Sequence, residues 1–215
     1  MAVIHKTTMR PTKLELLAPW LPARPWYLGA GRAPELSRVG GFRLDDPAGE
    51  VGIEFMVVED ASGERPVWYH LPLSYRAAPL DGAEHALIGT SEHGVLGQRW
   101  IYDGTHDPVL VAQLLALLQG RATPQMQSES DTPDPSVAVE GAEAIPGRPS
   151  GAPDVTDSPG GTCLAVGSLT LDVTRVLRRE EDVAEEAAAL AQVSAGWRLP
   201  DGGEGRGRFA VLRDS

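Results

Sequence analysis

Apolar and polar residues alternate along the first half of the chain, between Gly41 and Gly104. Three segments, 41–46, 50–60 and 65–76, keep this period of two and are separated by the turn-forming runs PAG and ASGE. Two more strand candidates follow at 85–93 and 94–104, and a short alternating run at 1–6 is a further one. Sequential strands joined by short turns predict an antiparallel meander.

Two segments keep a helical spacing instead. Thr12 and Glu15 have the spacing of a capping box, and the apolar residues that follow them predict a short helix that ends near the prolines at 19, 22 and 25. The second helix is predicted over 108–118, with Asp107 as its N-cap and Gly120 just past its end. Its almost wholly apolar interior predicts burial against the sheet.

The pattern changes after Gly120. Residues 121–161 are rich in Pro, Ser, Gly and Asp and show no sustained period, which predicts a disordered linker. Apolar alternation returns at 162–179, and 193–214 reads as a closing hairpin, while 180–192 fits either a frayed helix or a loop. The predicted organisation is therefore a domain over 1–120, a linker over 121–161, and strands in 162–215 that complete the same domain, since this last piece is short for independent stability. The fold class is α+β, a curved antiparallel sheet packed on one or two helices.

Composition narrows the possible partners. The 215-residue chain carries 30 acidic and 19 basic residues, a net charge of −11, which argues against a nucleic acid or an anionic membrane as partner. Cys163 is the single cysteine, so an internal disulfide and a cysteine-based zinc site are excluded. No segment resembles a signal peptide or a membrane span, and the cytoplasm is the expected location.

Catalytic motifs are missing. The five histidines are scattered, and the chain has no phosphate-binding loop, dinucleotide fingerprint or nucleophile elbow, so no catalytic, cofactor or metal residue is assigned. One candidate acid–base cluster remains in YDGTHDP, where Asp103, His106 and Asp107 lie close together. The competing interpretation is structural: Asp107 caps the following helix and Asp103 holds the turn.

An aromatic cluster follows the first helix, within LELLAPWLPARPWY. Trp20, Trp26 and Tyr27 either close one end of a small core or form an exposed anchor for a partner. Because Trp20 lies beside the leucine stripe of the helix, it is expected in the core, and Trp26 or Tyr27 is expected to be the exposed docking residue.

These segments, together with HALIGTSEHGVLGQRWIYDGTHDPVLVAQLLALL, resemble the N-terminal cap domain of actinobacterial maltokinases and the related glucosamine kinases. The resemblance covers roughly residues 1–120 and implies a cystatin-like topology, with the sheet wrapped on a helix. It also implies a link to α-glucan, trehalose or amino-sugar metabolism, the setting in which names such as 1,4-α-glucan branching protein occur. In the family a two-lobed kinase with an HGD-type loop and a magnesium-binding aspartate follows the cap. Nothing similar follows here, so no catalytic residue is carried over.

Three hypotheses for the function result. The first is a non-catalytic, cap-like accessory module whose partner is a sugar kinase or another glucan- or trehalose-metabolising enzyme. The second is an enzyme of glucan metabolism with an unrecognised active site around Asp103, His106 and Asp107. The third is a small-ligand carrier that uses the face of the sheet.

Overall fold

The computed structural model describes residues 8–29, 31–141, 153–180 and 189–214. All fourteen strands in these ranges belong to one antiparallel sheet, in the order β1-β5-β6-β4-β3-β2-β13-β14-β11-β10-β9, with β7, β8 and β12 attached at its sides. The first half contains β1 (Met9–Arg10), β2 (Leu36–Leu44), β3 (Gly52–Asp60), β4 (Val67–Arg76), β5 (Leu87–His93) and β6 (Gly97–Asp103). The second half contains β7 (Gln125–Met126), β8 (Ala138–Glu140), β9 (Asp154–Ser158), β10 (Gly161–Val166), β11 (Leu169–Val173), β12 (Val176–Leu177), β13 (Ala191–Arg198) and β14 (Glu204–Asp214).

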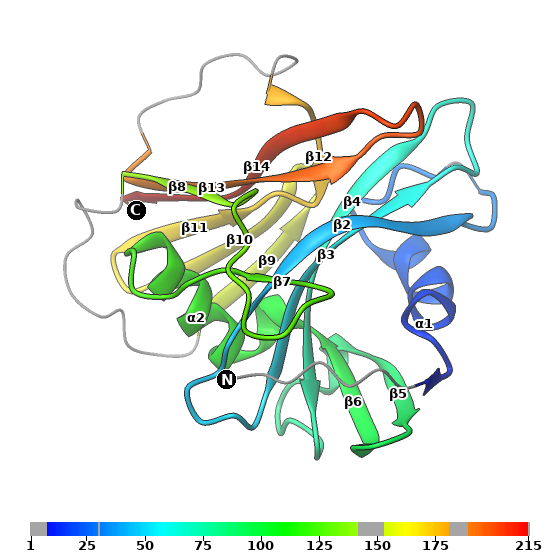
Figure 1. Cartoon of the computed structure of the whole chain (residues 1–215), viewed down its shortest axis with the longest axis horizontal. Coiled ribbons are helices and arrows are strands. Elements are labelled where there is room, and N and C mark those ends of the chain that lie inside the picture. Colours follow the sequence, from blue (N-terminus) through cyan, green and yellow to red (C-terminus); the bar gives the residue numbers. More distant parts are fainter. Residues whose placement is uncertain (1–7, 30, 142–152, 181–188, 215) are drawn as a thin grey trace.

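The two α-helices lie on opposite faces of the sheet. They are α1 (Lys13–Trp20) and α2 (Pro108–Leu118), and short 3-10 turns occupy Leu21–Ala23, Glu84–Ala86 and Gly104–His106. Figure 1 shows α1 beside β3 and β4 and α2 beside β10 and β11. The predicted capping box of Thr12 and Glu15 is confirmed, and so is the N-cap of Asp107 on α2. No helix in the described part of the chain has the length and apolar character needed to cross a membrane.

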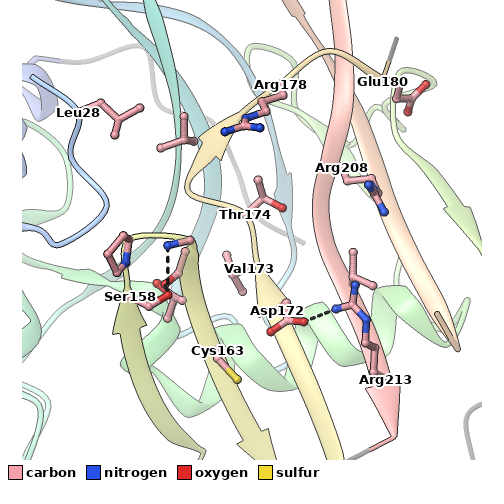
Figure 2. Close-up of a pocket in the computed structure, with 16 residues that line it drawn as sticks. Leu28, Ser158, Cys163, Asp172, Val173, Thr174, Arg178, Glu180, Arg208 and Arg213 are labelled. Carbon is pink, nitrogen blue, oxygen red and sulfur yellow. Dashed lines mark hydrogen bonds and ion pairs between the residues drawn. The ribbon is translucent and has the colours of Figure 1, made fainter. Parts of the chain in front are cut away.

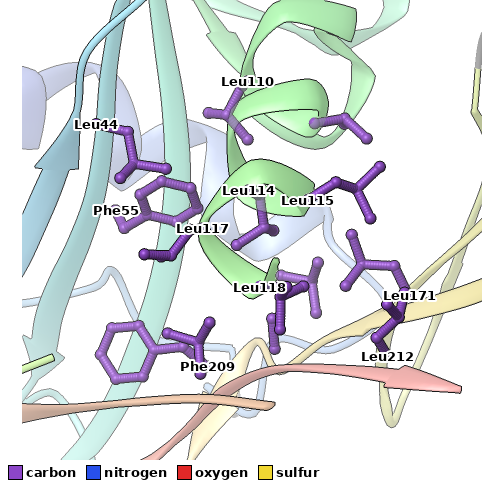
Figure 3. Close-up of a cluster of buried hydrophobic side chains, with 14 of the residues drawn as sticks. Leu44, Phe55, Leu110, Leu114, Leu115, Leu117, Leu118, Leu171, Phe209 and Leu212 are labelled. Atoms are coloured by element: carbon purple, nitrogen blue, oxygen red, sulfur yellow. The ribbon is translucent and has the colours of Figure 1, made fainter. Parts of the chain in front are cut away.

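Alternation in β3 explains the two cores. Phe55 and Val57 face α2, whereas Met56 and Val58 face α1, so β3 is apolar on both sides. In the larger core the leucines of α2 pack against Phe55, Phe209, Leu171 and Leu212, as Figure 3 shows. Because these partners come from both halves of the sequence, a single core joins the two halves.

The C-terminal strands continue the sheet of the N-terminal ones and close a ring with it. From β4 the pairing runs through β3, β2, β13 and β14 to β11, and β12, which follows β11 directly, returns to β4 through Val176↔Tyr69 and Leu177↔Trp68. The β2–β13 contact needs a glycine at position 40, where an added Cβ atom would lie 2.9 Å from the Cβ of Trp197, its partner on β13. A cystatin-like wrapping of a sheet on one helix is not confirmed.

A disordered linker over 121–161 is not confirmed either. Within it β7 pairs with β2, β8 pairs with β13 and β9 pairs with β10, so these parts of the segment belong to the sheet. Residues 142–152 lie outside the described residues, as do the predicted strand at 1–6 and most of 180–192, where the choice between helix and loop was open. The division into 1–120, 121–161 and 162–215 stays a prediction.

Candidate functional site

The side chain of Trp26 points into the protein. It is 0% exposed and belongs to the core under α1, together with Leu17, Leu21 and Tyr69. Its ring centroid lies 6.0 Å from that of Tyr69 and 5.9 Å from that of Trp20, which is only half-buried. The sequence predicted Trp20 in the core and either Trp26 or Tyr27 exposed; Trp26 is instead fully covered, whereas Trp20 and Tyr27 are both half-buried.

The backbone after α1 explains this orientation. Arg24 and Tyr27 donate backbone hydrogen bonds to the carbonyls of Leu21 and Arg24, so the chain keeps turning beyond the helix and returns toward the sheet. This turn places the indole of Trp26 against β4, where it packs on apolar side chains that include Tyr69 and Leu71.

Tyr27 and Leu28 form the part of this stretch that reaches the surface. The half-buried Tyr27 stacks on Tyr69, and its hydroxyl donates a 2.9 Å hydrogen bond to Asp60. Burial and the Asp60 carboxylate raise the pKa of Tyr27 to about 12, so the phenol stays protonated at neutral pH. The Leu28 side chain is 58% exposed.

Arg175, between β11 and β12, contacts residues from both halves of the chain. Its side chain is 0% exposed, and its guanidinium lies 5.0 Å from the centre of the Trp26 ring, in a cation–π contact. Nη2 donates to both carboxylate oxygens of Asp103 at 2.8 and 2.7 Å and to the hydroxyl of Thr105 at 3.0 Å, and Nε donates to Thr162 at 2.7 Å. The sequence analysis missed this arginine, because its partners lie far away along the chain.

Asp103 is thereby committed to an ion pair inside the protein. Burial alone would raise its pKa, but the charge and hydrogen bonds of Arg175 outweigh that effect and hold the pKa below its usual range. A carboxylate that is buried, ionised and paired in this way has no free position for a substrate proton. Asp103 anchors Arg175, and it also holds the turn that follows, since the backbone amide and the hydroxyl of Thr105 donate hydrogen bonds to Oδ1 at 3.2 and 2.8 Å.

Asp107 and His106 face other partners. Asp107 accepts a bidentate pair of 2.7 Å hydrogen bonds from Nε and Nη2 of Arg76 and a 3.0 Å bond from the Val109 backbone, as an N-cap does. Burial would raise the pKa of Asp107, yet the hydrogen bond from Arg76 lowers it. The Nδ1 of His106 lies 3.1 Å from Nε2 of His85, and burial lowers the pKa of His106.

The three candidate catalytic residues are therefore close in space but directed at three different partners. Two of them are carboxylates held in ion pairs, which favours the structural interpretation of this cluster. Within residues 8–29, 31–141, 153–180 and 189–214, no group of three or more His, Cys, Asp or Glu side chains is placed to hold a metal ion.

Another buried carboxylate lies on the α1 side of the sheet. Glu54 on β3 accepts hydrogen bonds from Lys13 at 2.5 Å, from the hydroxyl of Tyr75 and from the side-chain amide of Gln127 at 3.1 Å. Burial opposes the ionisation of Glu54, but the charge of Lys13 and the hydrogen bonds from Lys13 and Tyr75 lower its pKa below the usual range. Glu54 thus fixes the start of α1 to the sheet, and sequence reasoning assigned it no such role.

The described part of the chain is thus sheet-dominated, and its conspicuous carboxylates are engaged in internal pairs. Residues 20–107 match the family model of the maltokinase N-terminal cap domain. The matched range begins at Trp20, contains Trp26, Asp60 and Asp103, and ends at the N-cap of α2. The predicted resemblance to this cap domain is thereby confirmed for this part of the chain.

Proposed function

We propose that this protein is a non-catalytic, cap-like accessory module that associates with a separate enzyme of sugar metabolism, in the cytoplasm. A sugar kinase is the first candidate partner, and another enzyme of α-glucan, trehalose or amino-sugar metabolism is the second. The match of residues 20–107 to the maltokinase N-terminal cap domain carries this proposal.

The internal contacts support a role without catalysis. An active site around Asp103, His106 and Asp107 would need at least one carboxylate that can reach a substrate, and both are buried and paired with arginines. A small-ligand carrier would need a hollow on the sheet, and one lies beside Cys163 on the outer face of β10 and β11. Such a hollow is compatible with an accessory module that also binds a ligand.

The docking surface follows from the corrected position of the aromatic stretch. Trp26 is unsuitable as an anchor because its ring is covered, so the proposed contact uses Tyr27 together with the adjacent Leu28. Interfaces concentrate binding energy in a few central side chains, most often Trp, Tyr or Arg, that become desolvated. Tyr27 fits that role, and Leu28, which is 58% exposed beside it, adds apolar surface that a partner can cover.

Replacing Leu28 with Ser should weaken partner binding about tenfold, the effect of losing roughly 1.4 kcal/mol of contact energy, without changing the melting temperature. The tagged full chain is used to capture proteins from the native host, and a captured sugar kinase or glucan-metabolising enzyme is then purified and titrated against both forms. An unchanged affinity of Leu28→Ser contradicts the docking surface.

Val95→Ser supplies the matched control. Val95 is 59% exposed and Leu28 58%, but Val95 lies elsewhere, at the turn between β5 and β6. It should keep the wild-type affinity for the partner. If Val95→Ser loses binding and Leu28→Ser does not, the hairpin tip is the docking surface; if no enzyme of sugar metabolism is captured by either, the accessory role fails.

A further inference from the structure

A hollow of about 480 Å³ lies on the outer face of the C-terminal strands, away from α2. Its floor is a row of neighbouring positions on three strands: Cys163 on β10 pairs with Asp172 on β11, and Asp172 pairs with Val211 on β14. The turn from Ser158 to Gly161 and the exposed Leu28 close its sides. The volume lies in the range of small-molecule sites.

Three arginines surround this hollow in a protein of net charge −11. They are Arg178, Arg208 and Arg213, and the carboxylates among the lining residues are Asp172 and Glu180. Arg213 pairs with Asp172, and Glu180 lies 3.7 Å from the guanidinium of Arg206. The side chain of Arg178 makes no hydrogen bond or ion pair with any residue that the structure describes, and it lines the hollow.

The remaining lining groups suit a hydroxylated molecule. Figure 2 shows Thr174 between Arg178 and Arg208, with Asp172 directed at Arg213 below them. The Thr174 hydroxyl and the Asp172 carboxylate can bind ligand hydroxyls, and the aliphatic side chains of Leu28, Val176 and Val211 can pack against a ring face. A long polyanion such as a nucleic acid is disfavoured, because the surrounding protein is acidic.

We propose that this hollow is a binding site for a phosphomonoester of a sugar-sized, polyhydroxylated molecule. Arg178 and Arg208 meet the phosphate, since guanidinium groups bind phosphate oxygens through paired, charge-assisted hydrogen bonds. Asp172, oriented by Arg213, and Thr174 bind the hydroxyls. The lining residues all belong to this chain and the test uses the purified protein without a partner, so this proposal and that of the accessory role can fail separately.

The single cysteine of the chain supplies a reporter for this site. Cys163 lies in the hollow, half-buried, and burial together with the nearby Asp172 raises the pKa of its thiol. The thiol is therefore mostly protonated at neutral pH and reacts slowly with a disulfide reagent such as DTNB, through its small thiolate fraction. A ligand that fills the hollow should slow that reaction further.

The experiment follows the DTNB reaction of the purified full chain at constant ionic strength, with glucose 6-phosphate, inorganic phosphate or glucose added. Glucose 6-phosphate should protect the thiol in a saturable way, phosphate should do so more weakly, and glucose should have no effect at the same concentration. Isothermal titration calorimetry gives the same affinities without relying on Cys163.

Arg178→Gln should weaken the binding of glucose 6-phosphate about tenfold, the effect expected from losing one charge-assisted contact. Arg208→Gln is a second variant at the same edge of the hollow. The matched control is Arg65→Gln, which lies at an exposed turn on the other half of the sheet and should bind glucose 6-phosphate as the wild type does. The proposal is overturned if neither protection nor heat is seen with glucose 6-phosphate, if glucose protects equally well, or if both rim variants bind as the wild type does. Protection by inorganic phosphate alone would overturn the assignment of a sugar-sized ligand.

Discussion

Replacing Arg175 with Met should lower the free energy of unfolding by about 3–5 kcal/mol, a large part of the 5–15 kcal/mol typical of a domain. The change leaves the buried carboxylate of Asp103 without its partner and removes the hydrogen bond to Thr162. Urea unfolding followed by circular dichroism measures the loss. Arg65→Met, at an exposed position, should stay within about 0.5 kcal/mol of the wild type.

The double variant Arg175→Met with Asp103→Leu distinguishes the contribution of the ion pair to stability from that of side-chain packing. When both charges are removed, part of the lost stability should return, because a buried pair often contributes little more than apolar side chains of similar volume. The recovery is incomplete because Asp103→Leu also removes the two hydrogen bonds from Thr105. Nη1 of Arg175 has no hydrogen-bond partner in the part of the chain that the structure describes, so the pair is incompletely satisfied. A double variant as unstable as Arg175→Met would show that the contribution of Arg175 lies elsewhere.

Acid provides an independent check on the same pair. The pKa of Asp103 is lowered below its ordinary value of 3.8, so its ionised form contributes stability that is present above that pH and is lost as the pH falls through the folded-state pKa. The wild type should therefore lose more stability between pH 7 and pH 3 than the double variant, which lacks this carboxylate. Parallel curves for the two proteins would contradict the role assigned to Asp103.

Trp26→Ala should also cost about 3–5 kcal/mol, the usual loss when a large buried aromatic is truncated. The indole is fully covered by the core under α1 and contacts Arg175 from the other half of the chain. The change is measured by urea unfolding against Trp20→Ala as the matched control. Since Trp20 is only half-buried, its truncation should cost less. A larger loss for Trp20→Ala than for Trp26→Ala would contradict the orientation of this stretch.

Local signals in the sequence were sufficient to predict several of the elements. The capping box of Thr12 and Glu15, the N-cap of Asp107 and the alternation in β3 each depend on residues within a few positions, and all three appear as predicted. The cap-like identity of 20–107 could be predicted for the same reason, since its motifs follow one another in a fixed order.

Long-range contacts could not be predicted in this way. Arg175 and Asp103 are separated by 72 positions, and nothing near either residue indicates the other. The covered position of Trp26 depends on the same packing, because it requires β12 and Arg175 to lie beside β4. The Pro- and Ser-rich composition of 121–161 also concealed two strands. β7 and β8 have two and three residues, too few to produce a periodic pattern within such a segment.

The central claim is that the cap-like segment and the C-terminal strands form one closed sheet with a shared core. The most direct test is a protease site inserted between residues 145 and 150, followed by cleavage of the folded protein and size-exclusion chromatography without denaturant. The two fragments should elute together, because β12 pairs with β4, β13 pairs with β2, and Arg175 holds Asp103 across the cut. Fragments that separate under native conditions, each retaining its secondary structure, would contradict the claim.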